Sequence, residues 1–117
     1  PEYQRLLREA DEDVAGALRT YAATREGMTP VFAHADIQPA NVLCSSASGE
    51  ITAVIDFGLC HYGDVAVALH AIYRHFPRDF AQSVAQKYAE ATNTKPVTLE
   101  NAITARLAYE LEACAKK

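Results

Sequence analysis

The sequence has few cysteines, and their arrangement excludes two classes of small protein. Its 117 residues include three cysteines, Cys44, Cys60 and Cys114. The number is odd and no pair has C-x-x-C spacing, so neither a disulfide framework nor a zinc knuckle is expected. The pattern is typical of reduced thiols in a cytosolic protein, and we predict a cytoplasmic location.

The sequence also has fewer basic than acidic residues and no long apolar run. The net charge is -4 and the pI is about 5.5, so the basic face on which nucleic-acid binding depends is not expected. The sequence contains no apolar run long enough to span a bilayer and opens with no signal peptide, so we predict no membrane partner. A phosphate-bearing ligand remains compatible with this charge, because metal ions can hold phosphates.

Glycines are scattered singly, at Gly16, Gly27, Gly49, Gly58 and Gly63. The sequence therefore contains no glycine-rich loop that could cover nucleotide phosphates. It also has no strand with a V-A-I-K-type lysine.

The apolar periodicity predicts a mainly helical protein. Four stretches have helical spacing: residues 2–25, 65–76, 80–91 and 99–115. Their stripes are expected to face the core, among them Tyr3, Leu6, Leu7, Ala10, Val14, Leu18 and Tyr21 in the first helix, Phe80, Val84 and Tyr88 in the third, and Leu99, Ile103, Leu107 and Leu111 in the fourth. Gly27 and Pro30 are expected to close the first helix. We predict one domain, residues 1–117, of the α+β class.

A small β-hairpin is predicted between the first two helices. Residues 41–44 and 51–57 are short β-type runs, and the polar loop 45–50 between them contains one glycine. A further short extended run, residues 31–33, precedes a polar loop that contains Pro39.

Three oxygen-bearing side chains are brought together by this hairpin. Asp36 and Asn41 flank the loop that leads into its first strand, and Asp56 lies at the end of its second strand, which looks buried. Both strand ends lie away from the turn, so the pairing gathers two carboxylates and an amide in a small volume. A carboxylate can orient a hydroxyl and accept its proton, and carboxylate and amide oxygens are ligands of Mg²⁺.

The segments His34-Ala35-Asp36-Ile37-Gln38-Pro39-Ala40-Asn41 and Val54-Ile55-Asp56-Phe57-Gly58 resemble the aminoglycoside phosphotransferase and choline kinase superfamily. Its usual pattern is H-G-D-(L/I/F)-x-x-x-N followed by (V/I)-I-D-(F/W). The resemblance implies the C-terminal lobe of a protein-kinase-like fold, with helices around a small hairpin that carries the catalytic loop. The N-terminal nucleotide-binding lobe of the family is expected to be absent from this chain.

The resemblance also implies residue roles. Asp36 would be the catalytic aspartate, Asn41 and Asp56 would bind Mg²⁺ and, through it, ATP, and His34 would be structural. Asp64 matches an acidic residue that braces the catalytic loop, but the residue type suits a helix N-cap equally well. If the register is shifted by four, Ala68 occupies the bracing position. Ala35 stands where the family usually has glycine.

We therefore expect an ATP-dependent phosphotransferase lobe that acts with Mg²⁺ on a small-molecule hydroxyl acceptor. The alternative is a truncated, non-catalytic lobe that serves as a binding or self-association module, as a homodimer or with the absent lobe as its partner. A metal-dependent hydrolase is a third hypothesis, but it needs a denser cluster of ligands than one loop and one strand end.

Overall fold

The computed structural model describes residues 2–25 and 28–115, which form an α+β, mainly helical structure. Four α-helices and two two-stranded antiparallel sheets lie in this part of the chain. Their order is α1 (Glu2–Thr24), β1 (Val31–Ala33), the 3-10 helix η1 (Pro39–Asn41), β2 (Val42–Cys44), β3 (Ile51–Val54), β4 (His61–Gly63), α2 (Val65–His75), α3 (Arg78–Thr92) and α4 (Leu99–Ala115).

The four predicted helices are confirmed to within about two residues at their ends. Asp64 caps α2, because its carboxylate accepts from the backbone N–H of Ala66. Helix α3 ends at Asn93, which adopts the left-handed conformation with φ 54° and satisfies the last carbonyls of the helix. The predicted stop at Gly27 lies outside the described residues, as do the side chains of Tyr3, Leu6, Leu7 and Ala10 and the thiol of Cys114.

The predicted hairpin is confirmed as the antiparallel pair β2–β3, although its second strand is shorter than expected. Val42 pairs with Val54, and the turn contains Gly49 at φ 73°, a conformation that glycine adopts without a Cβ clash. Strand β3 ends at Val54 rather than Phe57. The physical reason is Asp56, whose φ of 61° takes the backbone out of the extended conformation.

A second ribbon, β1–β4, was not predicted. Val31 pairs with Gly63, Phe32 with Tyr62 and Ala33 with His61. The His61–Gly63 segment has no apolar alternation, and its partner lies about 30 residues earlier in the chain, so no local signal identifies it as a strand. This ribbon places the start of the polar loop, which follows Ala33, next to the segment before His61.

The packed faces of α2, α3 and α4 are made mostly of alanine, which corrects part of the predicted core: Tyr21 and Val84 do pack against it, but Val14 on α1 is exposed. Phe80 on α3 is exposed, and so are Ile103, Leu107 and Leu111 on α4. Alanine faces let helix backbones approach closely, and a pattern based on side-chain bulk does not identify them. The buried residues of these helices are Ala66, Val67, Leu69, Ala71, Ala81, Ala85, Ala89, Ala102 and Ala105.

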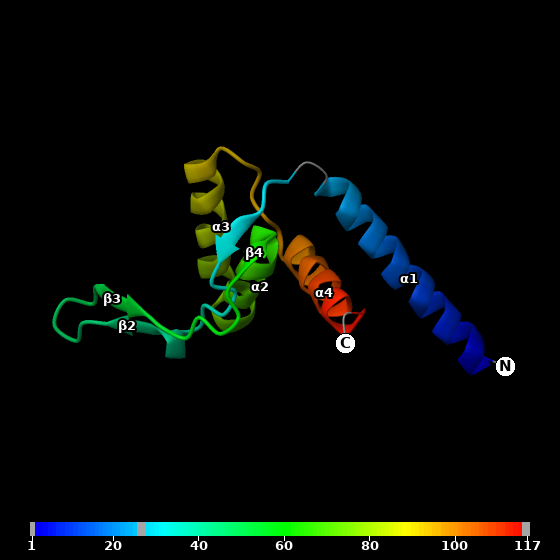
Figure 1. Cartoon of the computed structure of the whole chain (residues 1–117), viewed down its shortest axis with the longest axis horizontal. Coiled ribbons are helices and arrows are strands. Elements are labelled where there is room, and N and C mark those ends of the chain that lie inside the picture. The colour runs from blue at the N-terminus through cyan, green and yellow to red at the C-terminus, as the bar shows by residue number, and fades with distance from the viewer. Residues whose placement is uncertain (1, 26–27, 116–117) are drawn as a thin grey trace.

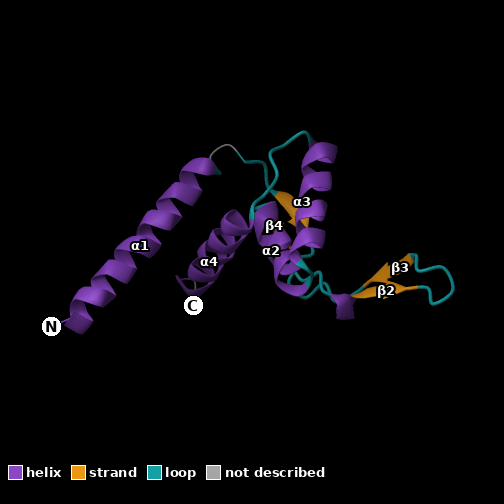
Figure 2. Cartoon of the chain, turned by 180° about the vertical axis from the view of Figure 1, so that it is seen from behind, coloured by secondary structure: helices purple, strands orange, loops and turns teal. Residues whose placement is uncertain are grey.

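The described chain is elongated. Helix α1 and the β2–β3 hairpin extend in opposite directions from the cluster of α2, α3 and α4 (Figures 1 and 2). The radius of gyration is 16.7 Å, compared with about 13 Å for a compact domain of this length. The hairpin is therefore not surrounded by helices, as the sequence had led us to expect, but projects from one end of them.

None of the described helices combines the length and the apolarity needed to cross a lipid bilayer.

Candidate functional site

The loop between β1 and η1 holds the Asp36 carboxylate with two side-chain amides. Gln38 Nε2 donates to Asp36 Oδ1 at 2.9 Å, and Asn41 Nδ2 lies 3.3 Å from Asp36 Oδ2. Amide donors stabilise the ionised form of a carboxylate and fix its orientation. Asp36 is half-buried, so it is held in place and still reaches the surface.

Asn41 is buried and is built into the backbone of the loop. Its Nδ2 also donates to the main-chain carbonyl of Asp36 at 2.9 Å, and its own N–H donates to the carbonyl of Gln38 at 2.9 Å. The side-chain amide nitrogen is therefore directed at Asp36. Among the described residues none donates to Asn41 Oδ1, which leaves this oxygen as the ligand atom that the side chain offers.

His34 ties the loop to the segment that follows β3. The Asp36 N–H donates to Nδ1 at 3.1 Å, and Nε2 lies 2.8 Å from the carbonyl oxygen of Ile55. A backbone N–H can only donate and a carbonyl can only accept, so Nδ1 is the acceptor and Nε2 carries the proton. The ring also packs edge-on against Phe57, with centroids 4.5 Å apart. These contacts hold the ring between the loop and the segment after β3, and the structural role of His34 stays a prediction.

Asp56 lies just beyond β3 and is exposed, which corrects the expectation of a buried strand end. The strand before it is exposed too, since Ile51 and Val54 at the two ends of β3 are both exposed. Asp56 Oδ1 accepts a long hydrogen bond of 3.4 Å from the Gly58 N–H. A Cβ at position 58 would lie 3.3 Å from the same oxygen, so glycine leaves room for the carboxylate.

Backbone and imidazole contacts place the three predicted side chains at one end of the hairpin. The Ile55 N–H donates to the carbonyl of Asn41 at 2.9 Å, and His34 joins Ile55 to Asp36. Asp36 and Asn41 touch directly. The Asp56 carboxylate makes no direct contact with either of them in the described part of the chain, although its neighbour Ile55 bonds to the backbone of Asn41.

The donor set suits a hard cation such as Mg²⁺. Mg²⁺ is usually held by one or two carboxylates and keeps several waters, so one carboxylate and one amide oxygen are compatible with it. Within residues 2–25 and 28–115, no group of three or more His, Cys, Asp or Glu side chains is placed to hold a metal ion. The ligands that complete such a site would therefore be substrate and water oxygens, which is unlike the dense cluster that a metal-dependent hydrolase needs.

Ala35 adopts an unusual backbone conformation next to Asp36. Its φ is 65°, in the left-handed region that favours glycine, and its side chain is buried. The structure thus gives a physical reason why glycine suits this position, and it shows that the methyl group is accommodated inside the protein.

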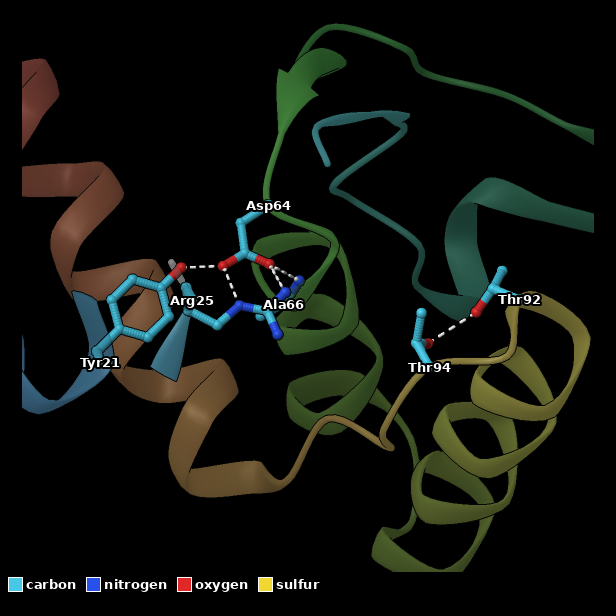
Figure 3. A network of polar contacts seen from close by, with 6 residues as sticks. All are labelled: Tyr21, Arg25, Asp64, Ala66, Thr92 and Thr94. Carbon is cyan, nitrogen blue, oxygen red and sulfur yellow. Dashed lines mark hydrogen bonds and ion pairs between the residues drawn. The ribbon is translucent and has the colours of Figure 1, made fainter. Parts of the chain in front are cut away.

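Asp64 joins α2 to α1 rather than to the loop. Its carboxylate accepts from the Tyr21 hydroxyl, from Arg25 Nε at 2.8 Å and from the Ala66 N–H at 2.9 Å, and Arg25 Nη2 makes a second, close contact (Figure 3). None of these bonds reaches the loop at residues 34–41. Of the two roles predicted for Asp64, these contacts show the N-cap. The bonds from Tyr21 and Arg25 connect the start of α2 to α1 and its end, not to the loop.

The same contacts change the acidity of both groups. Burial alone would raise the pKa of the Asp64 carboxyl, but the hydrogen bonds from Arg25, Tyr21 and Ala66 outweigh it and hold this pKa below its usual range. Burial, and then the hydrogen bond to Asp64, raise the pKa of the Tyr21 hydroxyl well above its ordinary value. At neutral pH the network therefore consists of a carboxylate, a guanidinium and a neutral phenol.

Two cavities lie away from these residues. One of about 520 Å³ lies beside Arg25, Val65 and Lys95, and another of about 400 Å³ lies beside Tyr21, His61 and Tyr109. Neither is lined by Asp36, Asn41 or Asp56. The candidate site, at the base of the hairpin, lies outside both cavities.

Three contacts were not predicted, one in the site loop and two in the Asp64 network. Gln38 was not among the predicted site residues, yet it makes the shorter hydrogen bond to the Asp36 carboxylate. Arg25 and Tyr21 were assigned only to a helix end and a helical stripe. The i, i+2 spacing of Asp36 and Gln38 was visible in the sequence, whereas the 39-residue separation of Arg25 and Asp64 left no local signal.

Comparison with known proteins gives one family and no individual relative. A family model described as the phosphotransferase enzyme family matches residues 1–102 of the 117. No curated protein and no solved structure matches the chain significantly.

Proposed function

Because this chain belongs to the phosphotransferase enzyme family, we propose that it supplies the catalytic-loop lobe of an ATP-dependent kinase for a small-molecule hydroxyl. In this proposal the lobe has the C-terminal-lobe architecture of protein kinases and folds as a single domain. Asp36 orients the acceptor hydroxyl, and Asn41 and Asp56 hold Mg²⁺ with the phosphates of ATP.

The observation that carries the proposal is the constraint on Asp36. Gln38 Nε2 holds one carboxylate oxygen at 2.9 Å, and Asn41 Nδ2 approaches the other at 3.3 Å. A carboxylate held in this way can meet a hydroxyl in a fixed direction, which lowers the entropy cost of reaching a reactive geometry. Its second oxygen is the less tightly held one and remains able to accept a proton.

The Asn41 and Asp56 oxygens are the ligands proposed for the metal ion. When bound, Mg²⁺ would offset the negative charge that develops on the transferring phosphoryl group. Asn41 contributes because its amide protons are engaged with Asp36, which turns Oδ1 away from that carboxylate. Asp56 contributes because it is exposed and, among the described residues, accepts only the long bond from the Gly58 N–H.

A substitution at Asp36 tests the reaction. Asp36→Asn keeps the side-chain size but removes the proton acceptor, so transfer of the γ-phosphate from MgATP to amino alcohols, sugars or amino acids should fall about 10²- to 10⁴-fold. Asp79→Asn, on the exposed first turn of α3, is the matched control and should leave transfer unchanged. The circular dichroism spectra of both variants should match that of the parent protein. Parental transfer by Asp36→Asn would exclude this role.

The second candidate function is self-association, and a specific feature favours it. Apolar side chains are exposed over both ribbons, with Ile51 at 67% and Tyr62 at 76% of full exposure. Contiguous exposed apolar surface commonly marks a contact with another protein surface. The exposed residues of the ribbons and the segment that joins them are Phe32, Leu43, Ile51, Val54, Ile55, Phe57, Leu59 and Tyr62.

Light scattering after size exclusion, over a range of concentrations, tests this candidate. Ile51→Lys should convert a dimer to a monomer if the ribbons form the contact. Ile103→Lys, on the exposed face of α4, is the matched control and should leave the mass unchanged. A monomeric parent protein at all concentrations would exclude self-association.

A further inference from the structure

We propose that Gln38 is a positioning residue for Asp36, and that it selects Oδ2 of that carboxylate as the atom that receives the acceptor proton. The inference rests on the proposed function, because it concerns how the same loop prepares the reacting carboxylate. Its basis is a difference in length between two contacts: the amide of Gln38 lies closer to Asp36 Oδ1 than the amide of Asn41 lies to Asp36 Oδ2.

Gln38 makes the tighter of the two contacts. Its Nε2 lies 2.9 Å from Oδ1, an ordinary hydrogen-bond length, whereas Asn41 Nδ2 lies 3.3 Å from Oδ2 and makes its better bond, of 2.9 Å, to the Asp36 backbone carbonyl. Oδ1 is thus committed to a donor, while Oδ2 keeps lone pairs for a substrate hydroxyl. Donation to Oδ1 withdraws charge from it and favours proton transfer to the other oxygen.

The backbone fixes Gln38 before any substrate arrives. Gln38 has φ -143° and ψ 163°, the extended conformation that a residue preceding proline favours, and Pro39 follows it. Its carbonyl accepts the Asn41 N–H at 2.9 Å. The backbone of Gln38 is therefore fixed by Pro39 and by the bond from the Asn41 N–H. This limits the conformational entropy that is lost when the Gln38 side chain bonds to Asp36.

In the proposed reaction, proton transfer to Asp36 accompanies the transfer of the phosphoryl group. As the acceptor oxygen forms its bond to the γ-phosphorus, the bond from that phosphorus to the bridging oxygen of ADP breaks. The O–H bond of the acceptor also breaks, and its proton moves to Asp36 Oδ2. Gln38 keeps its proton throughout and only donates to Oδ1. It acts through Asp36 and needs no contact with the reacting atoms.

The chain contains a matched control for this contact. Gln86 Nε2 donates to Glu90 Oε1 at the same 2.9 Å, but on the exposed face of α3, away from the loop. Gln86→Ala removes an equivalent glutamine–carboxylate bond without touching the proposed site. Any general effect of losing such a bond will appear in both variants.

The experiment measures steady-state phosphate release from MgATP, with water as the acceptor, for Gln38→Ala, Gln38→Glu and Gln86→Ala. Gln38→Ala should lower kcat about tenfold, a part of what a general base contributes, with the KM for MgATP within about twofold. Gln38→Glu keeps the shape but replaces the donor with an oxygen, so it should be at least as impaired. Gln86→Ala should match the parent protein.

A second readout does not depend on turnover. In nuclear magnetic resonance spectra, Asp36→Asn should shift the side-chain amide resonances of Gln38 and leave those of Gln86 in place. A kcat for Gln38→Glu equal to that of the parent protein, or an unmoved Gln38 amide, would overturn the positioning role. A parent protein without any turnover would instead exclude an active kinase that consists of this lobe alone, while the amide resonances still decide whether the contact exists.

Discussion

The Asp64 network should account for a large share of the stability of this chain. Asp64 caps α2 and pairs with Arg25 on α1, and only 7% of its side chain and 20% of that of Arg25 are exposed. Losing an N-cap costs about 1 kcal/mol. Removing one partner of a buried ion pair costs about 3–5 kcal/mol, and about half of that is expected here because Arg25 can still reach water. The Tyr21 hydroxyl would lose its acceptor as well, for about 1 kcal/mol.

These contributions overlap, so we expect Asp64→Ala to lower the free energy of unfolding by about 3 kcal/mol. Asp64→Asn keeps an oxygen for the cap but loses the charge, and should cost about 1–2 kcal/mol. The loss for Asp64→Ala corresponds to a fall in Tm of about 10 °C for a chain of this size.

Urea unfolding followed by far-ultraviolet circular dichroism measures both variants. Asp79→Ala, an exposed acid in the first turn of α3, is the control and should cost less than about 0.5 kcal/mol. A double-mutant cycle with Arg25→Ala should give a coupling energy of about 1 kcal/mol or more. The reasoning is refuted if Asp64→Ala costs no more than the control, or if the cycle shows no coupling.

Three further outcomes are expected. Folding lowers the pKa of the Asp64 carboxyl, so its contribution to the free energy of unfolding is complete above the unfolded pKa of about 4 and is lost as pH falls through the folded pKa. Folding raises the pKa of the Tyr21 hydroxyl, so the contribution of that group weakens as pH rises above about 10. The difference in unfolding free energy between the parent protein and Asp64→Ala should therefore be flat near neutrality and shrink in acid. Asn93→Ala should cost about 1 kcal/mol in urea unfolding and Asn93→Gly almost nothing, because φ is 54° there. Gly58→Ala should weaken Mg²⁺ binding severalfold in calorimetric titrations, because the new Cβ would lie 3.3 Å from Asp56 Oδ1, and unchanged affinity would argue against Asp56 as a ligand.

Most of the secondary structure and the main candidate site residues could be predicted from local sequence patterns. The four helices and the β2–β3 hairpin follow from apolar spacing, prolines and a glycine-containing turn, all of which act over a few residues. The approach of Asp36 to Asn41 follows from their spacing within one loop, and the structure places the segment after β3 beside them. The predicted roles of Asp36, Asn41 and Asp56 in catalysis and metal binding remain predictions.

Other features depend on contacts between distant segments. The β1–β4 ribbon, the ion pair of Arg25 with Asp64 and the exposure of Ile103 each depend on how the helices and ribbons pack. A periodic pattern identifies an apolar face of a helix but does not say whether a neighbour covers it. In α4, Ala102 and Ala105 are buried, whereas Ile103, Leu107 and Leu111 are exposed.

The sequence by itself determined where the helices lie, where the hairpin turns and which oxygen-bearing residues stand around it, because those properties depend on short-range sterics and hydrogen bonds. Only the tertiary structure decided that Asp64 is held by α1 and that the hairpin projects from the helices. Those outcomes depend on which surfaces meet in space, and that meeting is set by packing across the whole chain.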